Sequence, residues 1–341
     1  MVGSSGSIVR PPRRGRSVAL TGACSFLGKN LIGMLEEDDT VARLIAIDVD
    51  KPETAGAKTH MYDVDLTLPT ADERVAEILD AERVDTLLHL AFLSSPTHGS
   101  AWAHELESVG TMHLLNGARQ APPERLVLWS QTWLYGAKPH NPNFLVESAP
   151  LGAPEREPYF VDKIAAEREV GRYAEQHPET TVTVLRTAPI VGPTVNNYMI
   201  RYLSRPLLVK LLGFDPLWQF VHEIDAVAAF RIAIDRGRAG VFNVVGDGIL
   251  PLSKVVRLVG RPAAPLPLPV ARSVATMMWT GQLAPWPSSF LPYLRYLCVA
   301  DGGRAAAELG FCPAYTTQEA LMDFVSAQRL RDVRLAQQVE A

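Results

Sequence analysis

Apolar and polar positions follow two alternating patterns along the first 193 residues. Short apolar runs typical of buried strands alternate with longer stretches in which apolar residues recur every three or four positions, as on an amphipathic helix. The strand candidates are 17–20, 44–47, 59–64, 86–90, 126–129 and 182–185. The helix candidates between them are 27–35, 75–79, 106–118 and 158–174. Strands that alternate with helices predict an α/β protein whose parallel sheet is covered on both faces.

The pattern changes after residue 193, where proline, leucine and aromatic residues become frequent. The run 205–221 reads RPLLVKLLGFDPLWQFV and fits neither a strand nor a helix repeat throughout. A helix over 224–234 and a strand over 241–245 are expected to return to the main sheet, and a pair of helices over 300–327 closes the fold. We therefore expect a second, smaller and more irregular domain.

The chain thus divides into four parts. Residues 1–16 hold four arginines and no acid, and they lack the apolar stretch of a signal peptide, so we expect a disordered basic arm. Residues 17–193 form the larger domain, to which the segment 220–247 returns. Residues 194–328 form mainly the smaller domain, and residues 329–341 form a polar helical tail.

Composition and charge exclude several classes of protein. A hydrophobic content of 47% in 341 residues is ample for a folded core. The net charge is −4 despite the basic arm, so the folded part lacks the basic face that nucleic acids require, although the arm itself could contact anionic lipid or RNA. Three cysteines without a Cys-x-x-Cys pair argue against disulfides or a metal site, and we expect a cytoplasmic protein.

A glycine-containing turn, TGACSFLG, follows the first predicted strand and opens the first predicted helix. Small residues at Gly22, Ser25 and Gly28 let the backbone approach a pyrophosphate, which the helix N-terminus would bind. Asp48 ends the second strand at the spacing expected of a carboxylate that bonds an adenosine ribose. Because a carboxylate there repels a 2′-phosphate, NAD is favoured over NADP. The alternative interpretation of this sequence is a tight strand–helix turn with an aspartate that has no role in binding.

Tyr159 and Lys163 lie four positions apart in a predicted helix, so their side chains share one face. The phenol of tyrosine has an ordinary pKa near 10. A nearby ammonium group stabilises the phenolate and lowers that pKa towards working pH. Such a pair can exchange a proton with a substrate alcohol or ketone while a hydride moves to or from nicotinamide, and Lys163 can also bond the nicotinamide ribose.

These motifs resemble those of the extended short-chain dehydrogenase/reductases, the NAD-dependent epimerase/dehydratase group. The turn resembles the T-G-x-x-G-x-x-G loop of that family, with Ser25 in place of the middle glycine. HLAF at 89–92 and LRTAPIVGP at 185–193 resemble motifs of its fourth and sixth strands. The resemblance implies a Rossmann-type doubly wound parallel sheet, a smaller C-terminal substrate-binding domain, NAD as the cofactor and a homodimer.

The resemblance also implies which residues contact NAD. Asp65 and Leu66 match the pair after the third strand that lies near adenine in the family. The expected cofactor-binding residues are Gly22, Ser25, Phe26, Leu27, Gly28, Asp48, Asp65, Leu66, Leu90, Ala91, Phe92, Tyr159, Lys163 and Pro189.

Two positions depart from the family pattern. The third catalytic residue of the family is a serine or threonine, but Gln131 stands at that place, between Ser130 and Thr132. We expect Gln131 or Ser130 to join the tyrosine–lysine pair in catalysis, with Thr132 as the alternative after a register shift. Glu107 stands where a cofactor-facing asparagine is usual. These departures leave a non-catalytic NAD-binding scaffold as a second alternative.

Position 189 bears on the substrate. In the nucleotide-sugar branch of the family, an asparagine three residues after the arginine of strand six holds a substrate phosphate, whereas Pro189 cannot donate a hydrogen bond. We therefore expect hydride transfer at a secondary alcohol or ketone of an apolar small molecule, sterol-like or isoprenoid-like. A nucleotide-sugar epimerase or dehydratase is the alternative, with Arg201, Arg205 and Lys210 available for a diphosphate.

The C-terminal half is rich in aromatic and methionine side chains. They could line a pocket for a large hydrophobe, form the core of the smaller domain, or rest on a membrane surface. These residues are Trp218, Phe220, Met277, Met278, Trp279, Trp286, Phe290 and Tyr293.

Overall fold

The computed structural model describes residues 15–154, 157–284 and 286–340. Most of the expected basic arm, residues 1–14, lies outside the described residues. Its last residue does not belong to an arm: Arg16 opens the first strand, and its guanidinium lies 2.6 Å from the carboxylate of Asp235.

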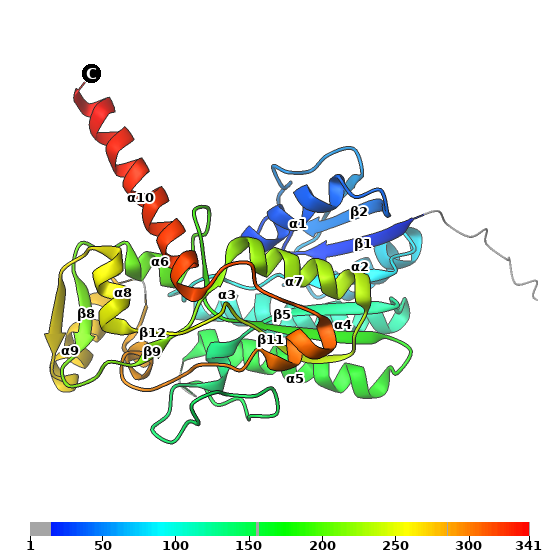
Figure 1. The fold of residues 1–341 in the computed structure, drawn as a ribbon. Coiled ribbons are helices and arrows are strands. Elements are labelled where there is room, and N and C mark those ends of the chain that lie inside the picture. Colours follow the sequence, from blue (N-terminus) through cyan, green and yellow to red (C-terminus); the bar gives the residue numbers. More distant parts are fainter. Residues whose placement is uncertain (1–14, 155–156, 285, 341) are drawn as a thin grey trace, which may run out of the picture.

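A seven-stranded sheet, parallel throughout, forms the centre of the larger domain (Figure 1). Its strands are β1 (Arg16–Thr21), β2 (Val41–Asp48), β3 (Thr59–Asp63), β4 (Thr86–His89), β5 (Arg125–Gln131), β6 (Thr181–Thr187) and β11 (Gly240–Val244). They lie in the order β11-β6-β5-β4-β1-β2-β3. The chain winds outward from β1 to β3 and then returns beside β1 with β4, so the order reverses between β1 and β4. Ligands of doubly wound sheets bind at such a point, and the predicted Rossmann-type fold class is confirmed.

Helices cover both faces of this sheet, which explains why its strands are apolar runs. On one face α1 packs against α7, and on the other α2 and α5 flank α4. The helices are α1 (Phe26–Glu36), α2 (Ala71–Ala81), α4 (Gly110–Gln120), α5 (Pro158–Gln176) and α7 (Glu223–Arg236). Before α4, the chain passes through α3 (Ser100–His104) and a π-helical turn, η1 (Glu105–Val109). Turns of this kind are rare and often occur at functional sites.

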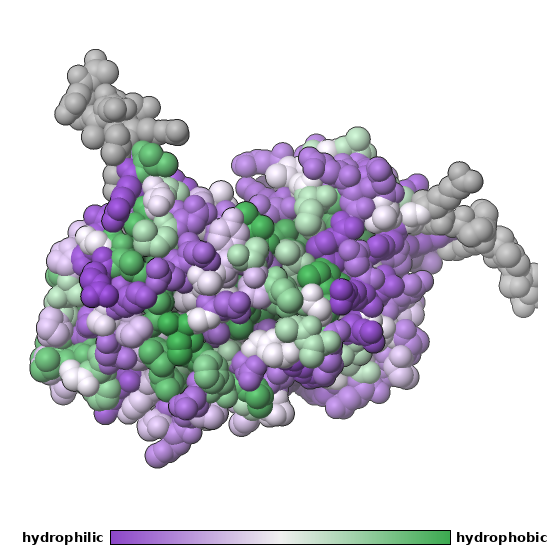
Figure 2. Space-filling view, in the orientation of Figure 1, coloured by the Kyte–Doolittle hydropathy of each residue, from purple (hydrophilic) through white to green (hydrophobic). Residues whose placement is uncertain are grey.

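The smaller domain is built from short elements. Its strands pair two by two: β8 (Leu208–Leu211) with β13 (Ala263–Leu266), and β9 (Leu217–Trp218) with β12 (Leu250–Pro251). Its helices are α6 (Tyr198–Leu203), α8 (Leu252–Val259), α9 (Leu268–Thr280) and the 3-10 helix η3 (Ser288–Leu294). Figure 2 shows more hydrophobic surface over this half of the molecule than over the larger domain.

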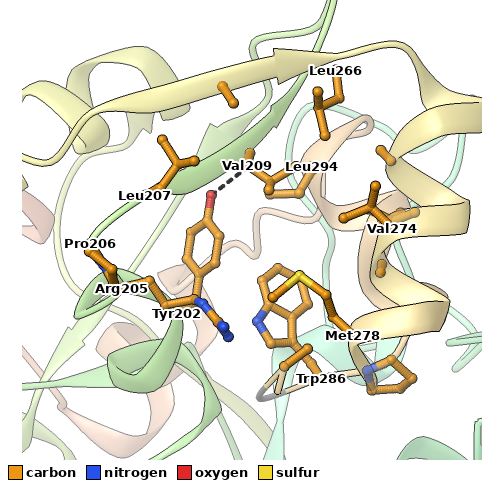
Figure 3. A pocket seen from close by; sticks show the side chains of 16 residues that line it. Tyr202, Arg205, Pro206, Leu207, Val209, Leu266, Val274, Met278, Trp286 and Leu294 are labelled. Carbon is orange, nitrogen blue, oxygen red and sulfur yellow. Dashed lines mark hydrogen bonds between the residues drawn. The ribbon is translucent and has the colours of Figure 1, made fainter. Parts of the chain in front are cut away.

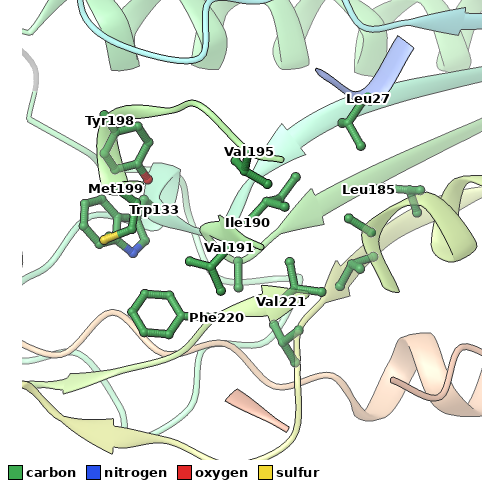
Figure 4. Packing of buried hydrophobic residues seen from close by; sticks show 14 of the residues in the cluster. Leu27, Trp133, Leu185, Ile190, Val191, Val195, Tyr198, Met199, Phe220 and Val221 are labelled. Atoms are coloured by element: carbon green, nitrogen blue, oxygen red, sulfur yellow. The ribbon is translucent and has the colours of Figure 1, made fainter. Parts of the chain in front are cut away.

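One apolar cluster joins the two domains. It runs from Leu27 on α1 through Ile190 and Val191 to Trp133 and Tyr198 (Figure 4). Ile190–Val191 forms β7, which pairs with β10 (Val221–His222) at the junction. The shared core fixes the smaller domain against the carboxyl ends of the sheet strands.

The C-terminal segment contains the two helical elements expected over 300–327, but it has no separate tail. A single π-helical turn, η4 (Ala305–Leu309), is followed by α10, which runs without a break over Thr317–Glu340 and projects from the body (Figure 1). Residue 329 is therefore not an element boundary. Within the described part of the chain, no helix has the length and apolar character needed to cross a membrane.

Candidate functional site

The glycine turn between β1 and α1 is shaped by close packing. Gly22 has a φ of +67°, and a Cβ atom there would lie 2.6 Å from the carbonyl carbon of Leu90. A Cβ atom on Gly28 would lie 2.4 Å from the carbonyl oxygen of Gly22. Ser25, by contrast, has a φ of −65° and caps α1 by accepting a hydrogen bond from the Gly28 N–H at 3.0 Å. Serine therefore replaces the family's glycine at this position without backbone strain.

Asp48, at the end of β2, points at this turn. Its Oδ2 accepts a hydrogen bond from the Cys24 N–H, and its Oδ1 accepts one from the Val49 N–H, both at 2.8 Å. An ionised carboxylate offers about four acceptor sites, so Asp48 keeps capacity for the hydroxyls of a ribose. Two residues after β3, Asp65 accepts hydrogen bonds from the backbone N–H and the hydroxyl of Thr67.

A groove of about 530 Å³ opens beside the turn, a volume within the usual range of small-molecule sites. Residues 24–27 line one side of it, Phe92 and Trp129 lie at the strand ends, and residues 194–197 form the opposite wall. The predicted Ser25, Phe26, Leu27 and Phe92 thus come together here. Glycine turn, carboxylate and groove fit a dinucleotide with its pyrophosphate at the N-terminus of α1. Pro189 lies in a narrower cleft that also contains Gln131 and Tyr198.

Leu90 and Ala91 lie directly after β4, between the glycine turn and the groove. Leu90 is buried against Gly22, and Ala91 is also buried. Leu66 is buried beneath α4, where its side chain contacts Gly110. Leu90 and Ala91 therefore pack against the glycine turn, and the contact of these three residues with NAD stays a prediction.

Tyr159 and Gln131 meet where β5 ends and α5 begins. Pro158 occupies the first turn of α5, where its missing N–H costs nothing, and Tyr159 follows it. The side-chain amide of Gln131 donates a hydrogen bond to the Tyr159 hydroxyl at 3.1 Å. Burial raises the pKa of Tyr159 above the ordinary value of tyrosine, and the hydrogen bond from Gln131 opposes that rise.

Lys163 lies one turn further along α5 and forms a buried ion pair with Glu107 on the π-helical turn. Its Nζ lies 2.6 Å from Oε1 of Glu107 and 3.8 Å from the centre of the Tyr159 ring. The exposed fractions of the two side chains are 4% and 1%. Burial lowers the pKa of Lys163 and raises that of Glu107, while their mutual attraction opposes both shifts.

The two carboxylate oxygens of Glu107 differ in their hydrogen bonds. Oε1 also accepts a hydrogen bond from the Leu93 N–H at 2.6 Å, whereas Oε2 is buried without a hydrogen-bond partner among the described residues. The sequence did not predict the pair, because its members are 56 positions apart. The available signal was that Glu107 replaces the asparagine of the family pattern.

Ser130 and Thr132, the neighbours of Gln131, have other contacts. The Ser130 hydroxyl donates a hydrogen bond to Glu167, and the Thr132 carbonyl accepts one from the thiol of Cys298. Gln131 is therefore the one of the three whose side chain is hydrogen-bonded to Tyr159. No cluster of three or more histidine, cysteine, aspartate or glutamate side chains suited to a metal ion occurs within residues 15–154, 157–284 and 286–340.

A parallel sheet with a dinucleotide-sized groove at its switch point, next to a buried tyrosine–lysine pair, defines a Rossmann-type oxidoreductase. A sequence profile of the NAD dependent epimerase/dehydratase family matches residues 18–245. The chain belongs to this family, and it is an enzyme of the NAD-dependent class.

Individual proteins are also similar to this chain over most of its length. An uncharacterised protein of Mycobacterium tuberculosis is 31% identical over 329 residues, which cover 94% of this chain and 86% of the relative. A 3-diazoavenalumate denitrifying reductase of Streptomyces is 26% identical over 77% of this chain and 87% of its own length. The solved UDP-glucose 4-epimerase of Thermus thermophilus, in complex with NAD, matches 92% of this chain and 99% of its own with a TM-score of 0.71 and 20% identity.

Proposed function

We propose that the protein transfers a hydride between NAD and a carbon that carries a hydroxyl or keto group, with Tyr159 as the general acid/base. The observation that carries this proposal is the buried Tyr159, whose hydroxyl is held by Gln131 and whose ring centre lies 3.8 Å from the ammonium of Lys163. NAD, when bound, accepts or returns the hydride. Asp48 and the glycine turn would hold its adenosine ribose and pyrophosphate.

The side chains divide the proton chemistry between them. Tyr159 removes the proton of the substrate hydroxyl, or returns it to the keto oxygen. Burial and the negative charge of Glu107 both raise the pKa of Tyr159 and so disfavour its phenolate. The positive charge of Lys163, 3.8 Å from the ring centre, is proposed to favour the phenolate once the substrate is in place. Gln131 donates its amide N–H to the phenolic oxygen and so stabilises negative charge there.

A nucleotide sugar is the substrate class with the better support. The Thermus thermophilus neighbour is a UDP-glucose epimerase, and its fold matches nearly the whole chain. The apolar substrate expected from the sequence has less support, because most of the side chains proposed to line its pocket lie elsewhere. Phe220, Phe290 and Tyr293 are core residues, whereas Met277 is exposed. Pro189, which offers no N–H to a phosphate, is the observation that keeps the apolar class as second candidate.

The test is product analysis by mass spectrometry after incubation of enzyme and NAD with mixed nucleotide sugars and, separately, with a lipid extract. We expect an isomerised or dehydrated sugar without net NADH. An oxidised lipid with matching NADH would instead establish the second candidate. No product in either pool, despite NAD binding, would favour the non-catalytic scaffold.

Tyr159→Phe provides the decisive variant, and Tyr173→Phe its control. We expect Tyr159→Phe to bind NAD but to lose about 10²- to 10⁴-fold in kcat, because the proton donor is missing. Tyr173 is a buried tyrosine on the same helix whose hydroxyl is hydrogen-bonded near Ala118 and Thr180, remote from Gln131. Turnover that survives in Tyr159→Phe would refute the catalytic role. The homodimer, the cytoplasmic location and the membrane contact remain predictions.

A further inference from the structure

A second cavity, of about 430 Å³, lies within the smaller domain (Figure 3). Leu207 and Val209, around the start of β8, form one wall, and Val274 and Met278 of α9 form the opposite wall. Trp286 also lines it. Its volume is within the usual range for small-molecule sites.

The cavity lining has few groups that can hydrogen-bond to water. Apart from one arginine and the indole N–H of Trp286, it consists of apolar and small side chains and of Tyr202, whose hydroxyl already donates a hydrogen bond to the Val209 carbonyl at 2.9 Å. A water molecule needs two to four polar partners to be held in a cavity. Filling this space with hydrocarbon would remove apolar surface from water, which is favourable in proportion to the area buried.

Arg205 is the one charged residue among the described side chains that line the cavity. It donates one hydrogen bond to the carbonyl of Leu283, in the segment after α9, and so reaches across from the segment after α6. Its guanidinium has no acidic partner in the described part of the chain. A planar guanidinium with free N–H groups binds a carboxylate in a bidentate manner.

The cavity is separate from the site of hydride transfer. The Trp286 ring is 5.2 Å from that of Phe290, and the Phe290 ring is 6.0 Å from that of Tyr159. Phe290 is buried, and neither Tyr159, Gln131 nor Lys163 lines the cavity. A molecule in the cavity is not in position to react at Tyr159.

We propose that this cavity binds a fatty-acid-like molecule, with its hydrocarbon chain between β8 and α9 and its carboxylate at Arg205. This second ligand is distinct from the hydride-transfer substrate. The apolar lining selects the chain, and the lone cation selects the acid over the corresponding alcohol.

Isothermal titration calorimetry with dodecanoate below its micelle concentration tests the proposal, with dodecanol and UDP as comparison ligands. We expect dodecanoate to bind the full-length protein at one site and dodecanol to bind at least tenfold more weakly. Arg205→Gln should weaken dodecanoate at least tenfold and leave dodecanol unchanged. Arg272→Gln, an exposed arginine of α9 that does not line the cavity, is the control and should bind as the unmodified protein does.

Ala275→Leu, which fills the cavity from α9, should weaken both lipids. NAD titration of each variant checks that the protein is folded and keeps this outcome independent of the proposed function. Absence of dodecanoate binding to the unmodified protein would overturn the proposal. So would dodecanoate binding to Arg205→Gln or Ala275→Leu that is as tight as binding to the unmodified protein. Binding of UDP that depends on Arg205 would also overturn it, because the cavity would then hold the nucleotide of the substrate.

Discussion

Two buried ion pairs lie one helical turn apart on α5, and they are built differently. Glu167 pairs with Arg186 of β6, and Lys163 pairs with Glu107. In the first pair every group is used: Ser130 donates to one carboxylate oxygen of Glu167, and Arg186 donates to the other. The remaining N–H groups of Arg186 include donors to the Tyr135 hydroxyl at 2.8 Å and to a backbone carbonyl at 3.1 Å.

The second pair is left incomplete. One oxygen of Glu107 accepts both of its hydrogen bonds, and the other has no partner within the described residues. A buried polar atom without a partner costs free energy, so its retention requires an explanation. The complete pair ties β5, β6 and α5 together, whereas the incomplete pair keeps bonding capacity next to Tyr159. From this difference we expect the first pair to serve stability and the second to serve chemistry.

The largest expected effect is the loss of stability when the complete pair, Glu167 and Arg186, is broken. Glu167→Gln would leave the buried Arg186 without a counter-charge and should lower the free energy of unfolding by about 3–5 kcal/mol. Urea denaturation at pH 7 measures this loss. The double variant Glu167→Leu/Arg186→Met removes both charges and should lose less than the single variant. A loss below about 1 kcal/mol in Glu167→Gln would contradict the structural role.

His89 provides a buried group that is fully bonded but uncharged. It lies between the hydroxyls of Thr21 and Thr111 at 2.7 and 2.8 Å, and burial lowers its pKa from 6.5 to about 3. Between pH 6.5 and about pH 3, the His89 imidazole is therefore protonated in the unfolded chain but neutral in the folded chain. Stability from this group is thus fully present above pH 6.5 and is lost as the pH falls, by about 2 kcal/mol at pH 5.

Urea denaturation at pH 7 and at pH 5 measures this dependence, with His89→Asn for comparison. The variant is expected to be less stable at pH 7 but to lose less stability between the two pH values. Equal losses in both proteins would show that His89 titrates normally in the fold.

A change in the incomplete pair, Glu107 and Lys163, should instead alter the pH dependence of turnover. Glu107→Gln keeps an acceptor for Lys163 but removes the negative charge, so the pKa of Lys163, already lowered by burial, falls further. If turnover needs the charged lysine, the alkaline limb of the kcat/KM profile should move to lower pH by about one unit. Glu169→Gln removes a partly exposed carboxylate of the same helix, which is paired with Arg172, and is the control. A profile that moves equally in both variants would place Glu107 in a structural role.

The smallest effect concerns Ser130. Ser130→Ala removes one hydrogen bond to Glu167 and should cost about 1 kcal/mol of stability. Its turnover should fall less than that of Gln131→Ala, because Gln131 contacts the Tyr159 hydroxyl. Steady-state kinetics of the two variants decide between them, and a larger loss in Ser130→Ala would assign the third catalytic position to Ser130.

Local spacing explains what could be predicted from the sequence. Gly22, Gly28 and Asp48 follow strands at fixed distances, and Tyr159 and Lys163 lie one turn apart, so chain geometry alone brings each set together. The alternation of apolar runs likewise predicted the central sheet, because its inner strands β1, β4, β5 and β6 are buried on both faces. The edge strand β3 has no fully buried residue.

Contacts between distant segments could not be predicted. Glu107 reaches Lys163 only because the π-helical turn packs on α5, and the partnership of Ser130 with Glu167 depends on how β5 faces that helix. The strands of the smaller domain are two to four residues long, too short for a periodic pattern to appear. Whether its aromatic side chains line a cavity or form a core depends on packing that no local pattern encodes.

The position of β11 has a consequence for synthesis of the chain. This strand covers the outer edge of β6, yet the smaller domain's first elements, α6 to β9, lie between the two in sequence. A ribosome-bound chain that has not yet released residue 244 therefore presents β6 with its row of N–H and C=O groups unpaired. Exposed edges of this kind recruit strands from other chains. Nascent chains that stall in the α6–β9 stretch are expected to depend on chaperones far more than the finished protein does.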